Sequence, residues 1–160
     1  MISLDFLEEV EVFQDLNDDQ LAAVQSYCKE SEYRRGDRLF GATEEPQYLW
    51  VVFDGQIELR QDLTGYHGFQ ADPISILSRG MTFGWSSLVP PFRYRLSAYC
   101  GSRRCRVLTF ERVALSRLLE DDSGIGYPVM SRIVAIVGER FHQLREEIIK
   151  GIGHDIINKW

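Results

Sequence analysis

The chain has 160 residues, of which 44% are hydrophobic, and it carries a net charge of −6. This length is enough for one domain with its own hydrophobic core. The acidic balance argues against a general nucleic-acid-binding protein, which needs a basic face. A local basic patch stays open, because five arginines cluster in mid-chain: Arg93, Arg95, Arg103, Arg104 and Arg106.

The first expected element is a helix over residues 17–30. Asn17 or Asp18 is a suitable N-cap, because a short polar side chain can accept a hydrogen bond from the first turn. Apolar side chains then recur at helical spacing, at Leu21, Val24 and Cys28.

Residues 33–110 show a different pattern, in which short β-branched and aromatic runs alternate with glycines. The runs are "YLWVVFDGQIELRQD", "PISILSRGMTFG" and "YRLSAYCGSRRCRVLTF". Asp54-Gly55 predicts a hairpin-like turn, since this dipeptide tolerates positive φ. We therefore expect a mainly β chain with flanking helices, built on an antiparallel β-roll or jelly-roll barrel of about eight strands.

The last region, residues 111–150, is expected to be helical. A short helix is predicted over Phe110–Leu119, and a long one from about Tyr127 to Lys150 that Gly151 and Gly153 end. An apolar stripe recurs along the long helix: Met130, Ile133, Val137, Phe141, Leu144 and Ile148. Two interpretations stay open, because the stripe can pack on the chain's own β-roll or on the same helix of a second subunit.

The stretch "FGWSSLVPPFRYRLSAYC", from Phe83 to Cys100, combines residue types that bind anions. Gly84 allows close backbone approach, and a short helical turn after it would aim N–H groups at an anion beside Ser86 and Ser87. Side chains alternate along an extended segment, so one face would carry Arg93, Arg95 and Ser97. A guanidinium there can bind phosphate bidentately. The alternative is a tight turn with solvated arginines.

Nothing in the sequence predicts an enzyme or a metal site. The three cysteines and three histidines are scattered, without zinc-ligand spacing, and there is no nucleophile–base motif. The odd cysteine count indicates a reducing cytoplasm. The N-terminus lacks the features of a signal peptide, and no apolar run approaches the roughly 20 residues of a membrane span. We expect a cytoplasmic protein without membrane contact.

The order of elements, together with three segments, carries a family resemblance. The segments are "YRRGDRLF", "YLWVVFDGQIEL" and "LSRGMTFGWSSLVPPFRYRLSAYCGSRRCRVLTF". Over residues 10–148 the chain resembles the cyclic nucleotide-binding domain, which is the sensor half of the catabolite-activator and fumarate-nitrate-regulator transcription factors. The glycine spacing, with Phe83-Gly84 and the downstream Arg95, is the most specific part of the resemblance.

The resemblance implies a phosphate-binding cassette. In the family, a Phe-Gly-Glu opens a short helix, the glutamate holds the ribose hydroxyl, and an arginine holds the cyclic phosphate. This chain has Trp85 in place of the glutamate and Leu96 where a small residue is usual, so the resemblance implies an altered site. Its candidate ligand-binding residues are Phe83, Gly84, Trp85, Ser86, Ser87, Arg93, Arg95, Leu96 and Ser97.

The long helix closes the pocket in the family, which implies a second set of residues. These lid or dimer-seam candidates are Met130, Ile133, Val137, Arg140, Phe141, Leu144, Arg145 and Ile148. The family's transcription factors continue into a DNA-binding domain, whereas this chain ends at Trp160. We therefore expect a single domain over residues 1–160, with no direct DNA binding.

Three functions fit these observations to different degrees. The first is a non-enzymatic ligand-sensing regulatory module, which binds cyclic nucleotide weakly, or another anionic small molecule, near Gly84 and Arg95 and signals through the long helix. The second is a ligand-silent interaction or dimerisation scaffold, with Trp85 in the core. An enzyme is the third and the least supported. The expected partners are a second copy of the chain, through the C-terminal helix, or a separate effector protein. No cofactor is expected beyond the candidate cyclic nucleotide ligand.

Overall fold

A computed structural model of the chain describes residues 1–61 and 73–157. The helices are α1 (Leu4–Glu9), α2 (Asp18–Gln25), the 3-10 turn η1 (Trp85–Ser87), α3 (Arg112–Asp121) and α4 (Ser123–Ile157). The strands are β1 (Cys28–Arg34), β2 (Arg38–Phe40), β3 (Tyr48–Asp54), β4 (Ile57–Arg60), β5 (Ser75–Leu77), β6 (Thr82–Phe83), β7 (Ser97–Cys100) and β8 (Arg104–Glu111).

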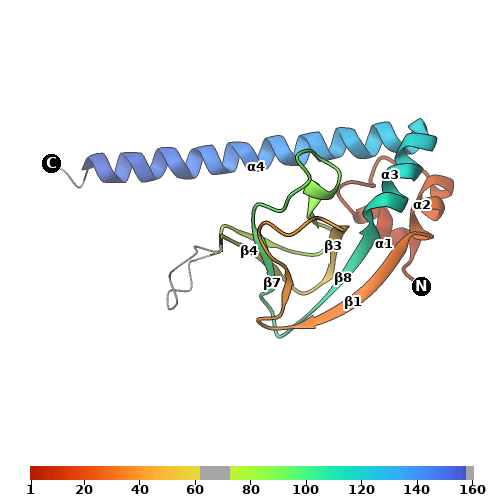
Figure 1. Ribbon diagram of the computed structural model, residues 1–160, viewed down its shortest axis with the longest axis horizontal. Helices are drawn as coiled ribbons and strands as arrows, with labels where there is room; N and C mark the ends of the chain where they lie inside the picture. The colour runs from red at the N-terminus through yellow and green to blue at the C-terminus, as the bar shows by residue number, and fades with distance from the viewer. Residues whose placement is uncertain (62–72, 158–160) are drawn as a thin grey trace.

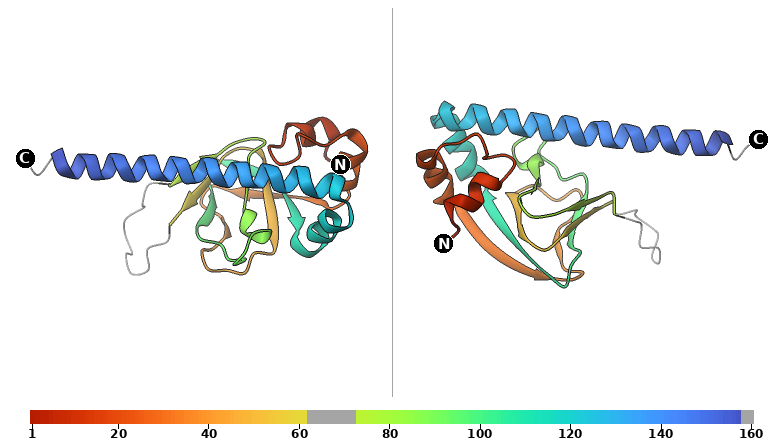
Figure 2. Two further views of the ribbon diagram at one scale, coloured as in Figure 1. Left: turned by 90° about the horizontal axis from the view of Figure 1, so that it is seen from above. Right: turned by 180° about the vertical axis from the view of Figure 1, so that it is seen from behind.

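The strands form two four-stranded antiparallel sheets, in the orders β1-β8-β3-β6 and β2-β7-β4-β5. The expected mainly β fold with flanking helices is confirmed, although the sheets do not close into a barrel. Helices α1, α2 and α3 gather at one end of the roll, and α4 runs along one side of it and extends past it (Figures 1 and 2). The green segment around η1 lies beneath α4.

Strand β3 is buried on both of its faces, and this explains its unbroken apolar run. Leu49 and Val51 pack into a cluster with α1, α2, α3 and the first half of α4. Trp50 and Val52 point the other way, into a second cluster between the two sheets. Since successive strand side chains alternate between faces, a strand between two cores needs apolar residues at every position.

The turn at Asp54-Gly55 has the expected backbone but a different topology. Gly55 has φ 83°, and a Cβ added there would lie 2.5 Å from the carbonyl oxygen of Arg104, so the position requires glycine. The predicted hairpin is wrong, because β3 and β4 belong to different sheets. The turn carries the chain from one sheet to the other.

The expected helix over residues 17–30 is too long. Asn17 caps α2, accepting a hydrogen bond from the backbone N–H of Gln20 at 3.0 Å in a capping box, and the helix ends at Gln25. Residues from Cys28 onward form β1, which pairs along its whole length with β8. Pairing with a strand about 80 residues away overrides the weak local helical pattern.

Helix α4 is longer than expected at both ends, running from Ser123 to Ile157. Pro128 lies inside the helix, and the glycines at 151 and 153 do not end it. A glycine costs a helix about 1 kcal/mol relative to alanine, which is too little to stop a long helix alone. The short helix begins later than predicted, because Phe110 belongs to β8 and α3 begins at Arg112.

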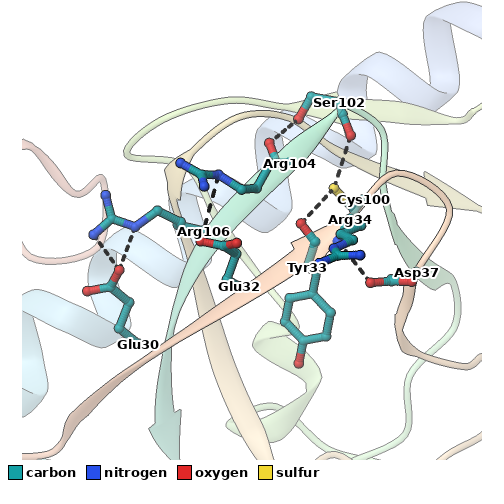
Figure 3. Close-up of polar contacts among 9 residues, drawn as sticks. All are labelled: Glu30, Glu32, Tyr33, Arg34, Asp37, Cys100, Ser102, Arg104 and Arg106. Atoms are coloured by element: carbon teal, nitrogen blue, oxygen red, sulfur yellow. Dashed lines mark hydrogen bonds and ion pairs between the residues drawn. The ribbon is translucent and has the colours of Figure 1, made fainter.

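The outer face of β1 and β8 carries cross-strand ion pairs (Figure 3). Arg106 pairs with Glu30, and Arg104 lies 3.7 Å from Glu32. Such pairs stabilise neighbouring strands by about 0.2–1 kcal/mol each. Arg95 instead lines the cavity described below.

Candidate ligand-binding site

The phosphate-binding cassette, residues 83–97, begins at the end of β6. Phe83 is fully buried and pairs with Trp50 of β3. Gly84 has φ 67°, and a Cβ added there would lie 2.6 Å from Cδ1 of Trp50. Glycine is therefore required both by the left-handed backbone and by the close approach to the indole ring.

The turn after Gly84 is shorter than an anion-binding helix. It is a single 3-10 turn, in which the N–H of Ser87 donates to the carbonyl of Gly84 at 3.1 Å. The Ser87 side chain is fully buried, and its Oγ has no hydrogen-bond partner among the described residues. The expected role of Ser87 as an anion donor finds no support in this geometry, since both of its donor groups face the protein.

A cavity of about 70 Å³ lies between the cassette, the roll and α4. Its lining residues are Phe40, Leu59, Gly84, Trp85, Ser86, Tyr94, Arg95, Leu96 and Arg140. The fold thus brings together six of the predicted site residues, including Arg140 from the far end of the chain. Four other predicted residues, Phe83, Ser87, Arg93 and Ser97, do not line the cavity.

The predicted common face of Arg93, Arg95 and Ser97 does not form. Arg93 is exposed, and Ser97 is buried with its Oγ accepting a hydrogen bond from the N–H of Ala42 at 2.8 Å. Residues 91–96 are irregular, and the strand begins only at Ser97, so strict alternation does not apply to them. Arg95 reaches the cavity while remaining solvent-exposed, and no carboxylate in the described chain pairs with it.

Tyr94, which belongs to the cassette, is buried against strand β2. Its ring stacks on Phe40, with centroids 3.8 Å apart, and its side chain is 5% exposed. The phenol oxygen accepts a hydrogen bond from Nε1 of Trp50 at 3.1 Å and donates to the carbonyl of Tyr48 at 3.0 Å. Burial raises the pKa of Tyr94, so the phenol stays protonated.

Trp85 both lines the cavity and contacts the core. Its half-buried indole packs against the helical cluster that contains Leu49, Val51 and Val129. The side chain therefore occupies the cavity wall next to Gly84, where it supplies an apolar surface.

Arg140 supplies the second cation of the cavity. Its guanidinium donates to the carbonyl oxygen of Thr82 at 2.5 Å and lies 3.7 Å from the carboxylate of Glu11. Burial lowers the pKa of Arg140 and raises the pKa of Glu11, because desolvation disfavours both charges.

The apolar stripe of α4 divides along the helix. Ile133 is buried in the helical cluster, against which Met130 and Val137 pack. Beyond Arg140 the helix leaves the roll, and Phe141, Leu144, Arg145 and Ile148 are all exposed. The first half of the stripe thus serves the chain's own core.

Phe40 and Leu59 are cavity residues that sequence reasoning missed. They come from β2 and β4, and no local signal marks them, because only the packing of the two sheets brings them under the cassette.

Among the residues that the structure describes, no three His, Cys, Asp or Glu side chains lie together as a metal site requires. Nor does that part of the chain contain a helix with the length and apolar character needed to cross a membrane.

No protein-family model matches the chain. It is 23% identical over 140 residues to the cGMP-dependent protein kinase egl-4 of Caenorhabditis elegans, a match that covers 85% of this chain and 17% of the kinase. The chain therefore spans about a sixth of that relative's length.

Two solved structures show the same architecture. A protein of Geobacter metallireducens, assigned by name only as cyclic nucleotide-binding, is 25% identical, with a TM-score of 0.74, and the match covers 89% of this chain and 100% of that one. The Catabolite Activator Protein of Thermus thermophilus is 22% identical, with a TM-score of 0.69 and coverage of 86% and 61%. The resemblance found in the sequence is confirmed at this level: the chain has the fold of the cyclic nucleotide-binding domains.

Proposed function

We propose that this chain is a ligand-sensing regulatory module that binds an anionic group between the cassette and α4. The observation that carries the proposal is one cavity lined by both Arg95 of the cassette and Arg140 of α4. A ligand in the cavity contacts both segments, so its binding favours one position of α4 relative to the cassette. The shift is limited by the ligand's difference in affinity for the two positions.

The ligand class is a phosphate-type oxyanion, carried by a cyclic nucleotide or another small molecule. The planar guanidinium groups of Arg95 and Arg140 can each bind such an oxyanion through two N–H groups. The solved relative from Geobacter, described as cyclic nucleotide-binding, supports the same class.

A cyclic nucleotide is expected to bind weakly, for two reasons. Trp85 offers one N–H donor and no acceptor for a ribose hydroxyl; losing a charge-assisted hydrogen bond costs about 1.5–3 kcal/mol, or about tenfold or more in Kd. The cavity of about 70 Å³ is also well below the roughly 300–1,000 Å³ of sites that bury small molecules. The lining residues must therefore move to admit a whole nucleotide.

The second candidate function is a ligand-silent dimerisation scaffold, and the exposed face of α4 favours it. One face of α4 carries large apolar residues every seven positions. These residues, which we call the α4 seam, are Tyr127, Val134, Phe141 and Ile148, and they are 54–78% exposed. Coiled coils pair helices through apolar residues at two positions of each seven, and the seam occupies one of these two positions. The partner that fits this face is a second copy of the chain, because its α4 presents the same seam. The alternative partner is a separate effector protein with such a helix.

Calorimetric titration with cyclic AMP and cyclic GMP tests the first proposal. Wild type is expected to bind at least one of them weakly, and Arg95→Ala to lose binding while keeping its circular dichroism spectrum. Arg93→Ala, a change of the same kind two residues away and outside the cavity, should bind as wild type does. Equal heats from wild type and Arg95→Ala would remove Arg95 from the site. If neither nucleotide produces heat on titration, the dimerisation scaffold becomes the better-supported function.

A further inference from the structure

Three segments far apart in the sequence meet at Arg140. Its Nη2 donates to the Thr82 carbonyl at 2.5 Å and lies 3.7 Å from Oε1 of Glu11. The same Oε1 accepts a hydrogen bond from the N–H of Thr82 at 2.6 Å, and the N–H of Glu11 donates to the carbonyl of Gly80 at 3.1 Å. The Glu11–Thr82–Arg140 cluster therefore joins α4 to the N-terminal segment and to the strand that leads into the cassette.

The cluster connects the wall of the cavity to α4. Thr82 lies two residues before Gly84, and the Arg140 side chain, which is 19% exposed, is part of the cavity wall. A change in the contacts of Arg140 therefore changes the cavity wall and the attachment of α4 together.

The contacts of the cluster leave hydrogen-bonding capacity unused. The hydroxyl of Thr82 is fully buried without a partner among the described residues. A guanidinium has five N–H donors, whereas both described contacts of Arg140 run through Nη2. Burying Arg140 and Glu11 penalises both charges, and their 3.7 Å separation recovers only part of that cost.

An oxyanion in the cavity would be a stronger partner for this guanidinium than its present ones. A phosphate accepts two parallel N–H bonds from one arginine, while a peptide carbonyl is neutral. The carboxylate of Glu11 is negative but does not lie at hydrogen-bonding distance from Arg140.

We propose that the Glu11–Thr82–Arg140 cluster links the cavity to α4: a phosphate-type oxyanion bound beside Arg95 draws the guanidinium of Arg140 away from Thr82 and Glu11, and α4 around Arg140 moves with it. The part of this inference that concerns the ligand rests on the proposed function. The restraint on α4 by Glu11 and Thr82 operates without ligand, so the two are tested separately.

The first test is hydrogen exchange, followed by mass spectrometry over residues 134–144 of α4 without ligand. Glu11→Gln removes the charge but keeps an acceptor for Thr82, and Arg140→Gln removes the cation. Each is expected to speed exchange about tenfold, corresponding to about 1.4 kcal/mol. The double variant should exchange no faster than the faster single one, because both break one cluster.

The matched control is Arg132→Gln. Arg132 also ties α4 to the N-terminal segment, through two hydrogen bonds to Asp15 at 2.6 and 2.8 Å, but it does not line the cavity. It should leave exchange over residues 134–144 unchanged. Unchanged exchange in Glu11→Gln and Arg140→Gln, or an equal effect of Arg132→Gln, would overturn the restraint.

The second test titrates the same variants with inorganic phosphate and with cyclic AMP. Glu11→Gln should bind about tenfold more tightly, because Arg140 loses its competing carboxylate, and Arg140→Gln about tenfold more weakly. Ligand should speed exchange over residues 134–144 in wild type and leave it unchanged in Arg140→Gln. If Arg95→Ala abolishes binding but the Glu11 and Arg140 variants bind like wild type, the link fails and the proposed function stands. Absence of binding in every variant overturns both.

Discussion

The ring of Tyr94 lies almost flat on the ring of Phe40, with centroids 3.8 Å apart and planes 14° apart. This contact joins the cassette to strand β2, and it occupies the interior of the roll next to the cavity. Tyr94 and Phe40 both line the cavity, so their stacked rings limit its size on that side.

Tyr94 variants should separate stability from access to the cavity. Tyr94→Phe keeps the stack but leaves the indole N–H of Trp50 unpaired, so unfolding should require about 1–3 kcal/mol less free energy. Tyr94→Ala should cost about 3–5 kcal/mol and bind cyclic AMP more tightly than wild type, because the cavity grows. Urea unfolding and calorimetry measure the two effects. A larger cavity without tighter binding would show that Tyr94 is not what excludes the nucleotide.

Trp85→Glu should restore an acceptor next to Gly84. A carboxylate accepts hydrogen bonds from a ribose hydroxyl, whereas an indole accepts none, so cyclic AMP should bind about tenfold more tightly or better. The variant should also be less stable than wild type, because the half-buried indole packs on the core. Titration with cyclic AMP and with its 2′-deoxy analogue gives the measurement. An equal gain for both ligands would contradict a contact with the hydroxyl.

Phe141→Glu should produce a monomer if the α4 seam pairs two copies. Phe141 is 63% exposed, so the substitution places a charge in the seam without disturbing the chain's own core. Val137 is a poorer test, since it packs against the helical cluster. The control is Gln143→Glu, which adds the same charge at an exposed position of the helix outside the seven-residue repeat. Light scattering reports the mass; a wild-type monomer, or a dimer that survives Phe141→Glu, would exclude the seam.

Glu111 should make stability depend on pH through the cap of α3. Its carboxylate accepts hydrogen bonds from the N–H groups of Ala114 at 2.8 Å and Val113 at 3.0 Å, which lowers the pKa of Glu111. A lowered folded-state pKa means that the stabilisation is present above the ordinary glutamate value and is lost as pH falls through the folded-state value. Glu111→Gln should therefore lower the free energy of unfolding by about 0.5 kcal/mol at neutral pH, a small effect because the side chain is partly exposed and water screens its charge.

The measurement is thermal or urea unfolding of Glu111→Gln and wild type across the acid range. The difference between them should shrink as pH falls, because protonated Glu111 and glutamine have similar capping ability. A difference that stays constant with pH would assign the effect to packing instead of charge.

Features that depend on a few neighbouring residues were predictable from the sequence. The helix cap at Asn17, the turns at Gly55 and Gly84, and the β-rich middle all follow from local backbone preference and side-chain alternation. The apolar stripe of α4 is equally local, because the helix period determines which side chains share a face.

Only the tertiary structure decided which side chains meet. Arg95 and Arg140 line one cavity because α4 crosses the cassette, while Arg93, two residues from Arg95, lies outside it. The same applies to the end of α2, where pairing of β1 with β8 takes over from a helical pattern. Local preferences are worth a few tenths of a kcal/mol to about 1 kcal/mol per residue, whereas burial of one large apolar side chain contributes about 1.5–3 kcal/mol. Packing between distant segments therefore determines the site, and a single sequence does not state which distant segments will pack.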